Sequence, residues 1–379
     1  MKVLHVYRTY FPDSQGGLEE VIRQICLAAQ DHGVTSKVFT LSDEPFPHTL
    51  PRVEAEVVRV RKTFEIASCG FALTGMRRFA QEVEWADIVH YHYPWPFSDM
   101  MYLTVGRHRP AILTYHSDIV RQQFLLSVYR PLMSRYLNAM NMIVATSPNY
   151  FATSEVLSEY TDKVEIIPIG LDEPSYPAID EQNRDLAAAR AKYGEGFFLF
   201  VGVLRYYKGL HILLDAMQGA RYKVVIVGSG PVERELRRQA QRLGLGNVIF
   251  AGFVSDREKM ALFRLCRAVV FPSYLRSEAF GVTLLEGAMS ARPLISAEVG
   301  SGTSHVNIHG ETGLVVPPGN STALRKAMDE LYQQEGKAQQ MGINARRRYE
   351  QLFTGARMGE RYADAYRRIL ATVSAAASA

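Results

Sequence analysis

The sequence contains little of what would place the protein in several common classes. Only three of its 379 residues are cysteines, Cys26, Cys69 and Cys266, and they stand far apart. An odd number of scattered cysteines favours neither a disulfide framework nor a zinc site, so we expect reduced thiols in a cytoplasmic protein. No apolar run approaches the about 18 residues of a membrane helix, and the first residues are too briefly apolar for a signal peptide.

Charge and glycine patterns argue against two further classes. The formal net charge is only +4, which is too small to indicate a nucleic-acid partner. The G-x-G-x-x-G fingerprint of dinucleotide-binding proteins does not occur in the sequence, which argues against an NAD- or FAD-dependent oxidoreductase. The composition, 47% apolar with nearly balanced charges, is that of a globular protein.

Short apolar runs alternate with helical stretches along most of the chain, which is the pattern of parallel α/β sheets with crossover helices. The length fits two domains of roughly 150–200 residues, and a segment dense in proline and glycine at 167–177 marks their boundary. We expect a first domain over 1–175 and a second over 176–356. The segment 357–379 is expected to form a helix that packs back on the first domain, with a frayed tail after Leu370.

One stretch, 269–286, combines the features of an anion-binding site. Residues 269–271 form a β-branched and aromatic run, which predicts a buried strand that ends at Pro272. A glycine-containing loop follows, and an apolar helical pattern opens at Val282 or Thr283. Free backbone N–H groups and the positive end of the helix dipole converge at such a place, so it suits a phosphate group.

Two glutamates flank this loop, Glu278 before the helix and Glu286 about one turn into it. A carboxylate accepts two hydrogen bonds side by side, so it suits the vicinal hydroxyls of a ribose or a hexose. Beside a phosphate-binding helix end, the pair therefore indicates a nucleotide-sugar. Two glutamates at this spacing also occur on solvated helix surfaces, and that alternative stays open at this point.

Three further loops follow predicted strands, where open α/β sheets bind ligands. Gly16 and Gly17 follow the first strand, and glycines let a ligand phosphate approach the backbone; a bare turn is the alternative. Arg205 and Lys208 follow the first strand of the second domain and would face a diphosphate, unless they are exposed loop charges. His116 also lies just past a strand end, where it either touches substrate or has a structural role.

Taken together, these residues resemble those of the retaining glycosyltransferases of family 4. The E-x₇-E element of Glu278 and Glu286 is the most specific part, and the likeness runs from about residue 2 to about residue 366. The strings Thr-Tyr-His-Ser-Asp-Ile-Val, Arg-Tyr-Tyr-Lys-Gly-Leu and Gly-Ser-Gly-Thr-Ser are similar to those of bacterial mannosyltransferases that build O-antigen from GDP-mannose on a polyprenyl-diphosphate carrier. The resemblance implies the GT-B architecture, in which two Rossmann-like domains face a cleft.

The resemblance also implies a role for residues of the second domain. Glu278 would hold hydroxyls of the transferred sugar, and Glu286 would hold the ribose diol. Arg205 and Lys208 would neutralise the leaving diphosphate in place of a metal ion, which agrees with the absence of any D-x-D from the sequence. The other donor-binding residues, which would act through their backbone or line the nucleobase loop, are Ala279, Phe280, Gly281, Val282 and Phe253.

In the first domain, Gly16 and Gly17 would abut the diphosphate and the acceptor, and His116 would lie by the 6-hydroxyl of the sugar. One position departs from the family pattern, because the arginine that usually follows the glycine of the second domain's first strand is replaced by Val203. Positions 203 and 205 of an extended chain point to the same face, so we expect Arg205 to supply that charge.

These features predict an enzyme that transfers α-mannose from GDP-mannose to a lipid-linked saccharide without a metal ion. GDP-D-rhamnose and UDP-sugars are alternative donors, and a sugar-nucleotide epimerase or a non-catalytic binding module are alternative functions. The predicted enzyme is cytoplasmic and peripheral on the inner face of the plasma membrane. The arginines and large apolar residues of 121–137 predict either contact with anionic headgroups or a packed helix with a basic outer stripe.

Overall fold

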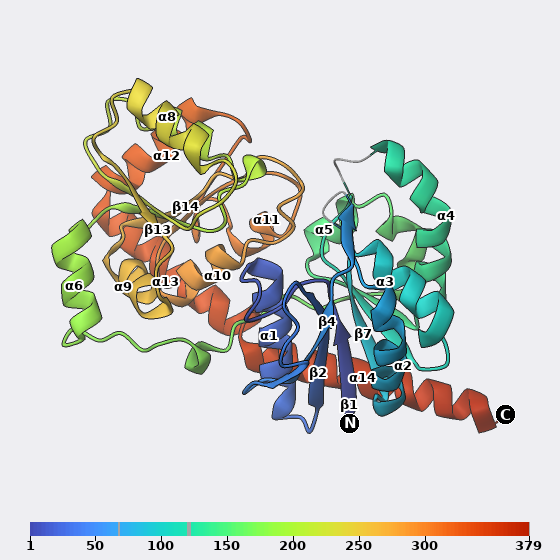
Figure 1. The fold of residues 1–379 in the computed structure, drawn as a ribbon. Coiled ribbons are helices and arrows are strands. Elements are labelled where there is room, and N and C mark those ends of the chain that lie inside the picture. The colour runs from blue at the N-terminus through green and yellow to red at the C-terminus, as the bar shows by residue number, and fades with distance from the viewer. Residues whose placement is uncertain (67–68, 120–122, 379) are drawn as a thin grey trace. The chain divides into compact units, whose positions relative to one another are not determined.

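The computed structural model describes residues 1–66, 69–119 and 123–378, and the chain divides into two compact units (Figure 1). Unit 1 comprises Met1–Gly170 and Gly355–Ala379, and unit 2 comprises Leu171–Thr354. The chain therefore leaves unit 1 inside the segment dense in proline and glycine, and it returns to unit 1 with its last helix.

Unit 1 is built on an eight-stranded sheet of order β10-β9-β8-β7-β1-β2-β4-β3. All neighbours pair in parallel except β3, which runs antiparallel to β4. The parallel strands coincide with the apolar runs of the sequence, whereas the short β3 and the hairpin of β5 and β6 carry too few apolar residues to stand out. The strands are β1 (Lys2–Val6), β2 (Thr35–Ser42), β3 (Thr49–Pro51), β4 (Glu56–Arg61), β5 (Phe64–Ile66), β6 (Cys69–Phe71), β7 (Ile88–Tyr93), β8 (Ala111–Tyr115), β9 (Met142–Ala145) and β10 (Val164–Ile166).

Helices cover both faces of this sheet. On one face α1 and α14 lie side by side, and tyrosine hydroxyls of α14 reach His90 and Thr114. On the other face Phe79 of α2 and Tyr136 of α4 pack against aromatic side chains of the strands. The helices are α1 (Gly17–Gln30), α2 (Met76–Trp85), α3 (Pro96–Met101), α4 (Gln123–Ala139), α5 (Pro148–Thr153) and α14 (Gly355–Ser378).

The last helix corrects one expectation. α14 continues to Ser378, so the prediction of a frayed tail after Leu370 is wrong. Alanine is the strongest helix former, and the alanine-rich end of the chain extends the helix that packing has already nucleated. The close approach to α1 requires Gly359, because a Cβ there would lie 2.2 Å from the carbonyl oxygen of Ala28.

The membrane-contact prediction for 121–137 is only partly within the structure, because 121–122 lie outside the described residues. The remainder forms most of α4, where Val128 and Arg130 are exposed. Among the helices in the described residues, none is long and apolar enough to cross a membrane.

Unit 2 is built on a six-stranded, fully parallel sheet of order β13-β12-β11-β14-β15-β16. Around it, α7 packs with α8 and α12, α6 with α9, and α10 with α13. The strands are β11 (Phe198–Val201), β12 (Val224–Val227), β13 (Val248–Gly252), β14 (Ala268–Phe271), β15 (Leu294–Ala297) and β16 (Gly313–Val316). The helices are α6 (Arg184–Tyr193), α7 (Leu210–Ala216), α8 (Glu233–Arg242), α9 (Asp256–Leu265), α10 (Val282–Met289), α11 (Thr303–Val306), α12 (Ser321–Gln333) and α13 (Glu335–Leu352).

Both strand orders contain a switch point, where the chain changes direction across the sheet. In unit 1 it lies between β1 and β7, and in unit 2 between β11 and β14. The loops that leave two such strands run to opposite faces of the sheet, which opens a crevice beyond their carboxyl ends. We therefore expect ligand-binding residues on the loops after β1 and β7 in unit 1, and on the loops after β11 and β14 in unit 2.

Candidate functional site

In unit 2, the loop after β14 carries Glu278, whose side chain is almost fully buried. Its Oε2 accepts a hydrogen bond from Lys208 Nζ at 2.5 Å and another from Ser273 Oγ at 3.0 Å. Lys208 lies on the loop after β11, so the pair joins the two loops that flank the switch point. The structure therefore brings together two residues that stand 70 positions apart in the sequence.

The backbone explains why these loops meet so closely. Gly209, which follows Lys208, has a φ of +70°, and a Cβ there would lie 2.0 Å from the carbonyl oxygen of Pro272. Only glycine combines this left-handed conformation with so close an approach. The ammonium group of Lys208 also lies 4.7 Å from the ring centre of Phe271, at the end of β14. A contact of this kind adds to the stabilisation of a buried cation.

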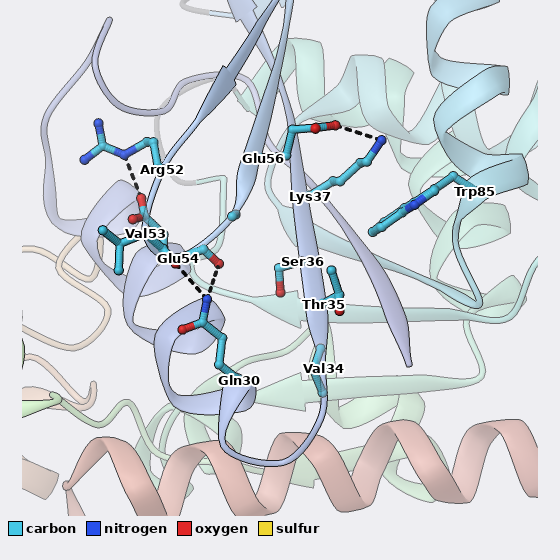
Figure 2. A pocket seen from close by; sticks show the side chains of 11 residues that line it. Gln30, Val34, Thr35, Ser36, Lys37, Arg52, Val53, Glu54, Glu56 and Trp85 are labelled. Carbon is cyan, nitrogen blue, oxygen red and sulfur yellow. Dashed lines mark hydrogen bonds and ion pairs between the residues drawn. The ribbon is translucent and has the colours of Figure 1, made fainter.

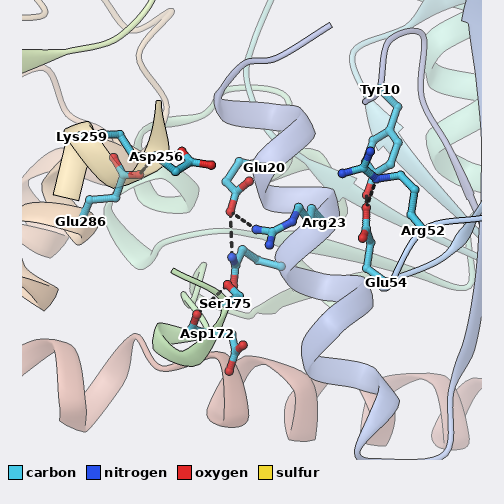
Figure 3. A network of polar contacts seen from close by, with 11 residues as sticks. Tyr10, Glu20, Arg23, Arg52, Glu54, Asp172, Ser175, Asp256, Lys259 and Glu286 are labelled. Atoms are coloured by element: carbon cyan, nitrogen blue, oxygen red, sulfur yellow. Dashed lines mark hydrogen bonds and ion pairs between the residues drawn. The ribbon is translucent and has the colours of Figure 1, made fainter. Parts of the chain in front are cut away.

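The second carboxylate, Glu286, is held by a lysine that the sequence pattern did not reveal. Lys259 Nζ lies 2.8 Å from Glu286 Oε1 and 3.1 Å from Asp256 Oδ1 (Figure 3). Burial by itself lowers the pKa of Lys259, but the charges of Glu286 and Asp256 outweigh that effect and raise it. The only available signal was a lysine three positions after an aspartate, at the start of a helix that follows a strand end.

The amino end of α10 lies between the two carboxylates in sequence. Gly281 forms its N-cap with a φ of +91°, and the helix begins at Val282, as predicted. Phe280 is buried beside the cap, and the carbonyl oxygen of Ala279 accepts a hydrogen bond from Gly302 N–H at 2.8 Å. Since the first N–H groups of a helix have no partner within it, this end can receive an anion beside the two carboxylates.

The structure corrects the expectation for Arg205. β11 ends at Val201, and the N–H of Arg205 donates to the carbonyl oxygen of Val203 at 2.9 Å. This bond closes a tight turn, so residues 203 and 205 do not share one face of an extended segment, and that prediction is wrong. Arg205 is exposed, and no hydrogen bond or ion pair of its guanidinium falls among the described residues. Phe253, just past β13, is 71% exposed.

In unit 1, Gly16 and Gly17 open the helix that follows β1. Gly16 is the N-cap of α1 in extended backbone, and Gly17 is the first helical residue. A Cβ on Gly16 would lie 2.7 Å from Glu19 Oε2, and Glu19 is itself held by Ser14 Oγ at 2.7 Å. The two glycines thus keep the amino end of a 14-residue helix open at the switch point.

His116 follows β8 and is 6% exposed. Its Nε2 lies 3.0 Å from Nδ1 of His92, and its backbone N–H donates to the carbonyl oxygen of Tyr93 at 3.1 Å. Burial lowers the pKa of His116 to about 3, so the ring is neutral at physiological pH. The sequence placed His116 correctly at a strand end, but it did not show that the ring is the outermost of a buried histidine cluster.

Three of these buried histidines bring ring nitrogens within 4.8 Å of one another, a spacing that also suits a metal ion. His5 Nδ1 and His92 Nε2 lie 3.1 Å apart, however, so one hydrogen bond satisfies both of these nitrogens without an ion. Both nitrogens of His90 are hydrogen-bonded to hydroxyl groups. The described contacts therefore fit a hydrogen-bonded cluster of neutral rings better than a metal centre.

A separate cavity of about 550 Å³ lies beside the first residues of β2, at the amino end of that strand (Figure 2). Its charged groups pair with each other: Arg52 Nε lies 2.8 Å from Glu54 Oε1, and Lys37 Nζ lies 2.8 Å from Glu56 Oε1. It is at the opposite edge of the sheet from the switch-point loops, so we do not place the functional site there.

Family models and curated relatives cover nearly the whole chain. "Glycosyltransferase Family 4" matches residues 15–173, and "Glycosyl transferases group 1" matches residues 181–348. D-rhamnosyltransferase WbpZ of Pseudomonas aeruginosa is 52% identical over 354 residues, which are 93% of this chain and 92% of the relative. O-antigen chain mannosyltransferase C of Escherichia coli is 47% identical over 374 residues, 99% of this chain and 100% of the relative.

Solved structures resemble the chain over its full length at low sequence identity. Sucrose-phosphate synthase from Thermosynechococcus elongatus gives a TM-score of 0.79 at 21% identity and covers 98% of this chain and 99% of its own. WaaG, a glycosyltransferase involved in lipopolysaccharide biosynthesis, gives 0.68 at 17% identity, with 96% and 99% covered. At such identities the likeness shows the fold alone.

Proposed function

This chain belongs to the family 4, group 1 glycosyltransferases and has the GT-B fold, and from that premise we propose that it transfers α-mannose from GDP-mannose in O-antigen synthesis. The predicted family and fold are thereby confirmed. The proposed acceptor is a saccharide on a polyprenyl diphosphate, so the enzyme would work at the inner face of the plasma membrane.

The observation that carries this proposal is the pair of buried carboxylates in unit 2, each held by its own lysine. Glu278, paired with Lys208, precedes α10, and Glu286, paired with Lys259, lies about one turn into this helix. A carboxylate that a lysine holds in place can accept hydrogen bonds from sugar hydroxyls. In the proposed complex, Glu278 binds the transferred sugar and Glu286 binds the ribose diol.

The chemistry follows from where charge develops. When the bond between the anomeric carbon and the diphosphate breaks, negative charge grows on the leaving phosphate. Lys208, Arg205 and the N–H groups at Phe280 to Val282 would stabilise that charge, with no reorganisation at the moment of reaction. The acceptor hydroxyl adds to the same face of the sugar, which retains the configuration, and its proton passes to the leaving phosphate.

Residues of unit 1 are assigned to the acceptor and the reacting sugar in this proposal. Gly16 and Gly17 would abut the diphosphate and the acceptor, because neither residue places a Cβ at the amino end of α1, where the first N–H groups of the helix lie. His116 would lie by the 6-hydroxyl of the sugar. Phe253, exposed at the end of β13, would line the nucleobase loop.

D-rhamnosyl transfer is the second candidate, because the D-rhamnosyltransferase of P. aeruginosa is 52% identical to this chain. D-rhamnose is mannose without the 6-hydroxyl, so the two donors differ at the group that we assign to His116. A site built to hydrogen-bond a hydroxyl rejects the analogue that lacks it far more strongly than an apolar pocket rejects an extra hydroxyl. Comparison of kcat/KM for GDP-mannose and GDP-D-rhamnose separates the two candidates.

The first experiment is a thermal-shift panel of GDP, UDP and ADP, followed by transfer assays with both GDP-sugars. Binding to the folded state alone raises the unfolding temperature, so we expect GDP to stabilise the protein more than UDP or ADP. A product with α configuration from α-linked donor shows retention. Stabilisation by UDP alone, or isomerisation of the donor in the absence of acceptor, would contradict the proposal and favour a UDP-sugar enzyme or an epimerase.

A further inference from the structure

Behind His116, unit 1 buries three more histidines that the proposed transfer reaction does not use. His5 lies on β1, and His90 and His92 lie on β7, the strand across the switch point. His5 is in register with His90, and alternate residues of a strand share a face, so all three rings project to the same side of the sheet. Each of the three is fully buried.

Three of the four rings form one hydrogen-bonded chain. His5 Nδ1 lies 3.1 Å from His92 Nε2, and His92 Nδ1 lies 3.0 Å from His116 Nε2. The two ends of the chain differ. His5 Nε2 is enclosed and has no partner among the described residues, whereas His116, at the other end, retains some solvent exposure. Since its Nε2 is bound inward, His116 presents Nδ1 outward.

His90 is equally buried but is bound elsewhere. Its Nε2 lies 2.7 Å from Thr114 Oγ1 and its Nδ1 lies 2.8 Å from the hydroxyl of Tyr366. It contacts the hydrogen-bonded chain only through its ring faces, with its ring centre 4.4 Å from that of His92 and 4.8 Å from that of His5. The hydroxyl groups of β8 and α14 thus satisfy His90 and leave the chain of three rings with no other partner among the described residues.

The hydrogen bonds between the three rings have a preferred direction because all three rings are neutral. Burial lowers the pKa of His5 and His116 to about 3 and lowers that of His92 as well, so each ring carries a single N–H. If the N–H groups pointed toward His5, its Nε2–H would be enclosed without an acceptor. Orphaned buried N–H groups are rarer in proteins than acceptors without a donor. The opposite direction, from His5 through His92 to His116, avoids that arrangement.

We propose that His5 and His92 are positioning residues that hold His116 as its Nδ1–H tautomer, so that His116 donates a hydrogen bond to an oxygen atom of the bound donor. The tautomer follows from unit 1 alone, and only the nature of that oxygen rests on the proposed function. Histidine in water prefers the Nε2–H form, so the arrangement has a signature that differs from that of an exposed ring. His116 would then act as a donor and not as a general base.

The first test reads the tautomer in the ligand-free, full-length protein labelled with ¹⁵N-histidine. Long-range ¹H–¹⁵N correlation spectra distinguish a protonated ring nitrogen from an unprotonated one, and the spectrum of His116→Gln assigns the signals. We expect a protonated Nδ1 and an unprotonated Nε2 for His116. The reverse pattern overturns the proposal, whether or not the protein proves to be a mannosyltransferase.

Two variants separate positioning from simple packing. His92→Leu removes the ring that donates to His116 Nε2, so the His116 ring is no longer held and should shift toward the Nε2–H form, with a loss of kcat/KM of roughly 3- to 10-fold from one neutral hydrogen bond. His90→Gln, the matched control, disturbs an equally buried ring outside the hydrogen-bonded chain and should leave the His116 signals unchanged. Unchanged signals in His92→Leu, or an equal change in His90→Gln, would contradict the proposal.

A third variant keeps the test open if His92→Leu fails to fold. The amide nitrogen of His5→Asn would lie where Nδ1 of histidine lies and would donate to His92 Nε2, so this variant should keep the Nδ1–H signature of His116 and the activity. The bound oxygen is then located by titration with GDP and with GDP-mannose. A shift of the His116 Nδ1 signal with GDP indicates a phosphate oxygen, and a shift with GDP-mannose only indicates a sugar hydroxyl. No shift with either overturns the donor role.

Discussion

The carboxyl edges of the two sheets carry different kinds of polar side chains. In unit 2, two carboxylates and two lysines are buried as ion pairs beside the end of a helix. In unit 1, the corresponding edge holds neutral imidazole rings that are hydrogen-bonded to one another and to hydroxyl groups. Both edges lie at a switch point, so the same topology supports a site built on buried ion pairs and a cluster built on neutral rings.

The difference matches the ligands that we propose for each edge. A buried ion pair carries a desolvation cost that its own attraction barely offsets, so it is poor evidence for a role in stability. Such pairs are better explained by a ligand that brings two phosphates and several hydroxyls. The hydroxyls of a sugar carry no charge, and neutral hydrogen-bonding groups such as His116 are sufficient to orient them. Acid and single substitutions at each edge test this contrast.

Acid should destabilise unit 1 strongly, because its buried histidines must stay neutral. Above pH 6.5 most of these rings are neutral in both the folded and the unfolded state. Below pH 6.5 the unfolded chain binds protons, whereas the folded rings of His5 and His116, with a pKa of about 3, stay neutral. The free energy of unfolding therefore falls as pH falls from 6.5 toward 3. At pH 5, His5 and His116 together account for a loss of about 4 kcal/mol. Both tryptophans, Trp85 and Trp95, belong to unit 1, so denaturant unfolding followed by their fluorescence measures this loss.

Two variants control this prediction: one replaces a buried histidine and the other replaces an exposed one. His5→Asn cannot take up a proton, so its unfolding free energy should depend less on pH, by about 2 kcal/mol between pH 7.5 and pH 5. His48→Gln, at an exposed position, should keep the full dependence. An equal pH dependence in both variants would show that the buried histidines are not its source.

Lys208→Met should have the largest effect on catalysis. It removes the cation that we assign to the leaving diphosphate and leaves Glu278 buried without its counter-ion. We expect kcat/KM to fall by more than about 200-fold, beyond the value of one charge-assisted hydrogen bond. Leaving a buried charge unpaired also costs roughly 3–5 kcal/mol of stability, which urea unfolding would measure.

The double variant Lys208→Met with Glu278→Gln separates these two losses. Without the unpaired charge, the stability should return to near the wild-type value, while the activity stays low. If the double variant recovers both stability and activity, the pair has only a structural role. It would then not support the assignment of donor binding to unit 2.

Much of this site was predictable because it follows from local pattern. The apolar run that ends at Phe271 predicts a strand, and the apolar spacing after Gly281 predicts a helix start. The structure confirms both, with a loop between them. Lys259 was not found, because its partner stands 27 residues away and nothing in the local sequence marks the pairing. The error at Arg205 came from extending a strand by alternation beyond Val201, where the backbone already turns.

The histidine chain shows a different limit of sequence reasoning. The alternation of His90 and His92 places both on one face of a strand, and that much is readable. Their contact with His5 depends on the pairing of β1 with β7, two strands that are separated in the chain by β2 to β6. Strand order is a property of the whole sheet, so no short stretch of the sequence reveals that these rings meet.

Glu286→Gln should have an intermediate effect, because it keeps the shape of the side chain but loses the charge that strengthens its hydrogen bonds to the ribose. We expect kcat/KM to fall about 10- to 200-fold, mainly through a higher KM for the donor. Lys259→Met removes only the group that holds this carboxylate, so its loss should be smaller. In the double variant the two losses should not add, because both act through one carboxylate. Additive losses would contradict the assignment of Lys259 as a support for Glu286.

Arg205→Ala should have the smallest effect of the series. An exposed guanidinium is well solvated before the ligand arrives, so its contact with a phosphate is worth less than that of the buried Lys208, and we expect a loss of about 3- to 10-fold in kcat/KM. The matched control is Arg221→Ala, another exposed arginine, which lies before the amino end of β12 and should leave the activity unchanged. If Arg205→Ala behaves like that control while Lys208→Met is inactive, Arg205 does not replace the arginine missing at Val203. Lys208 would then be the only side-chain cation among the residues assigned to the diphosphate. The positive charge that distinguishes unit 2 at this position would come from that one residue.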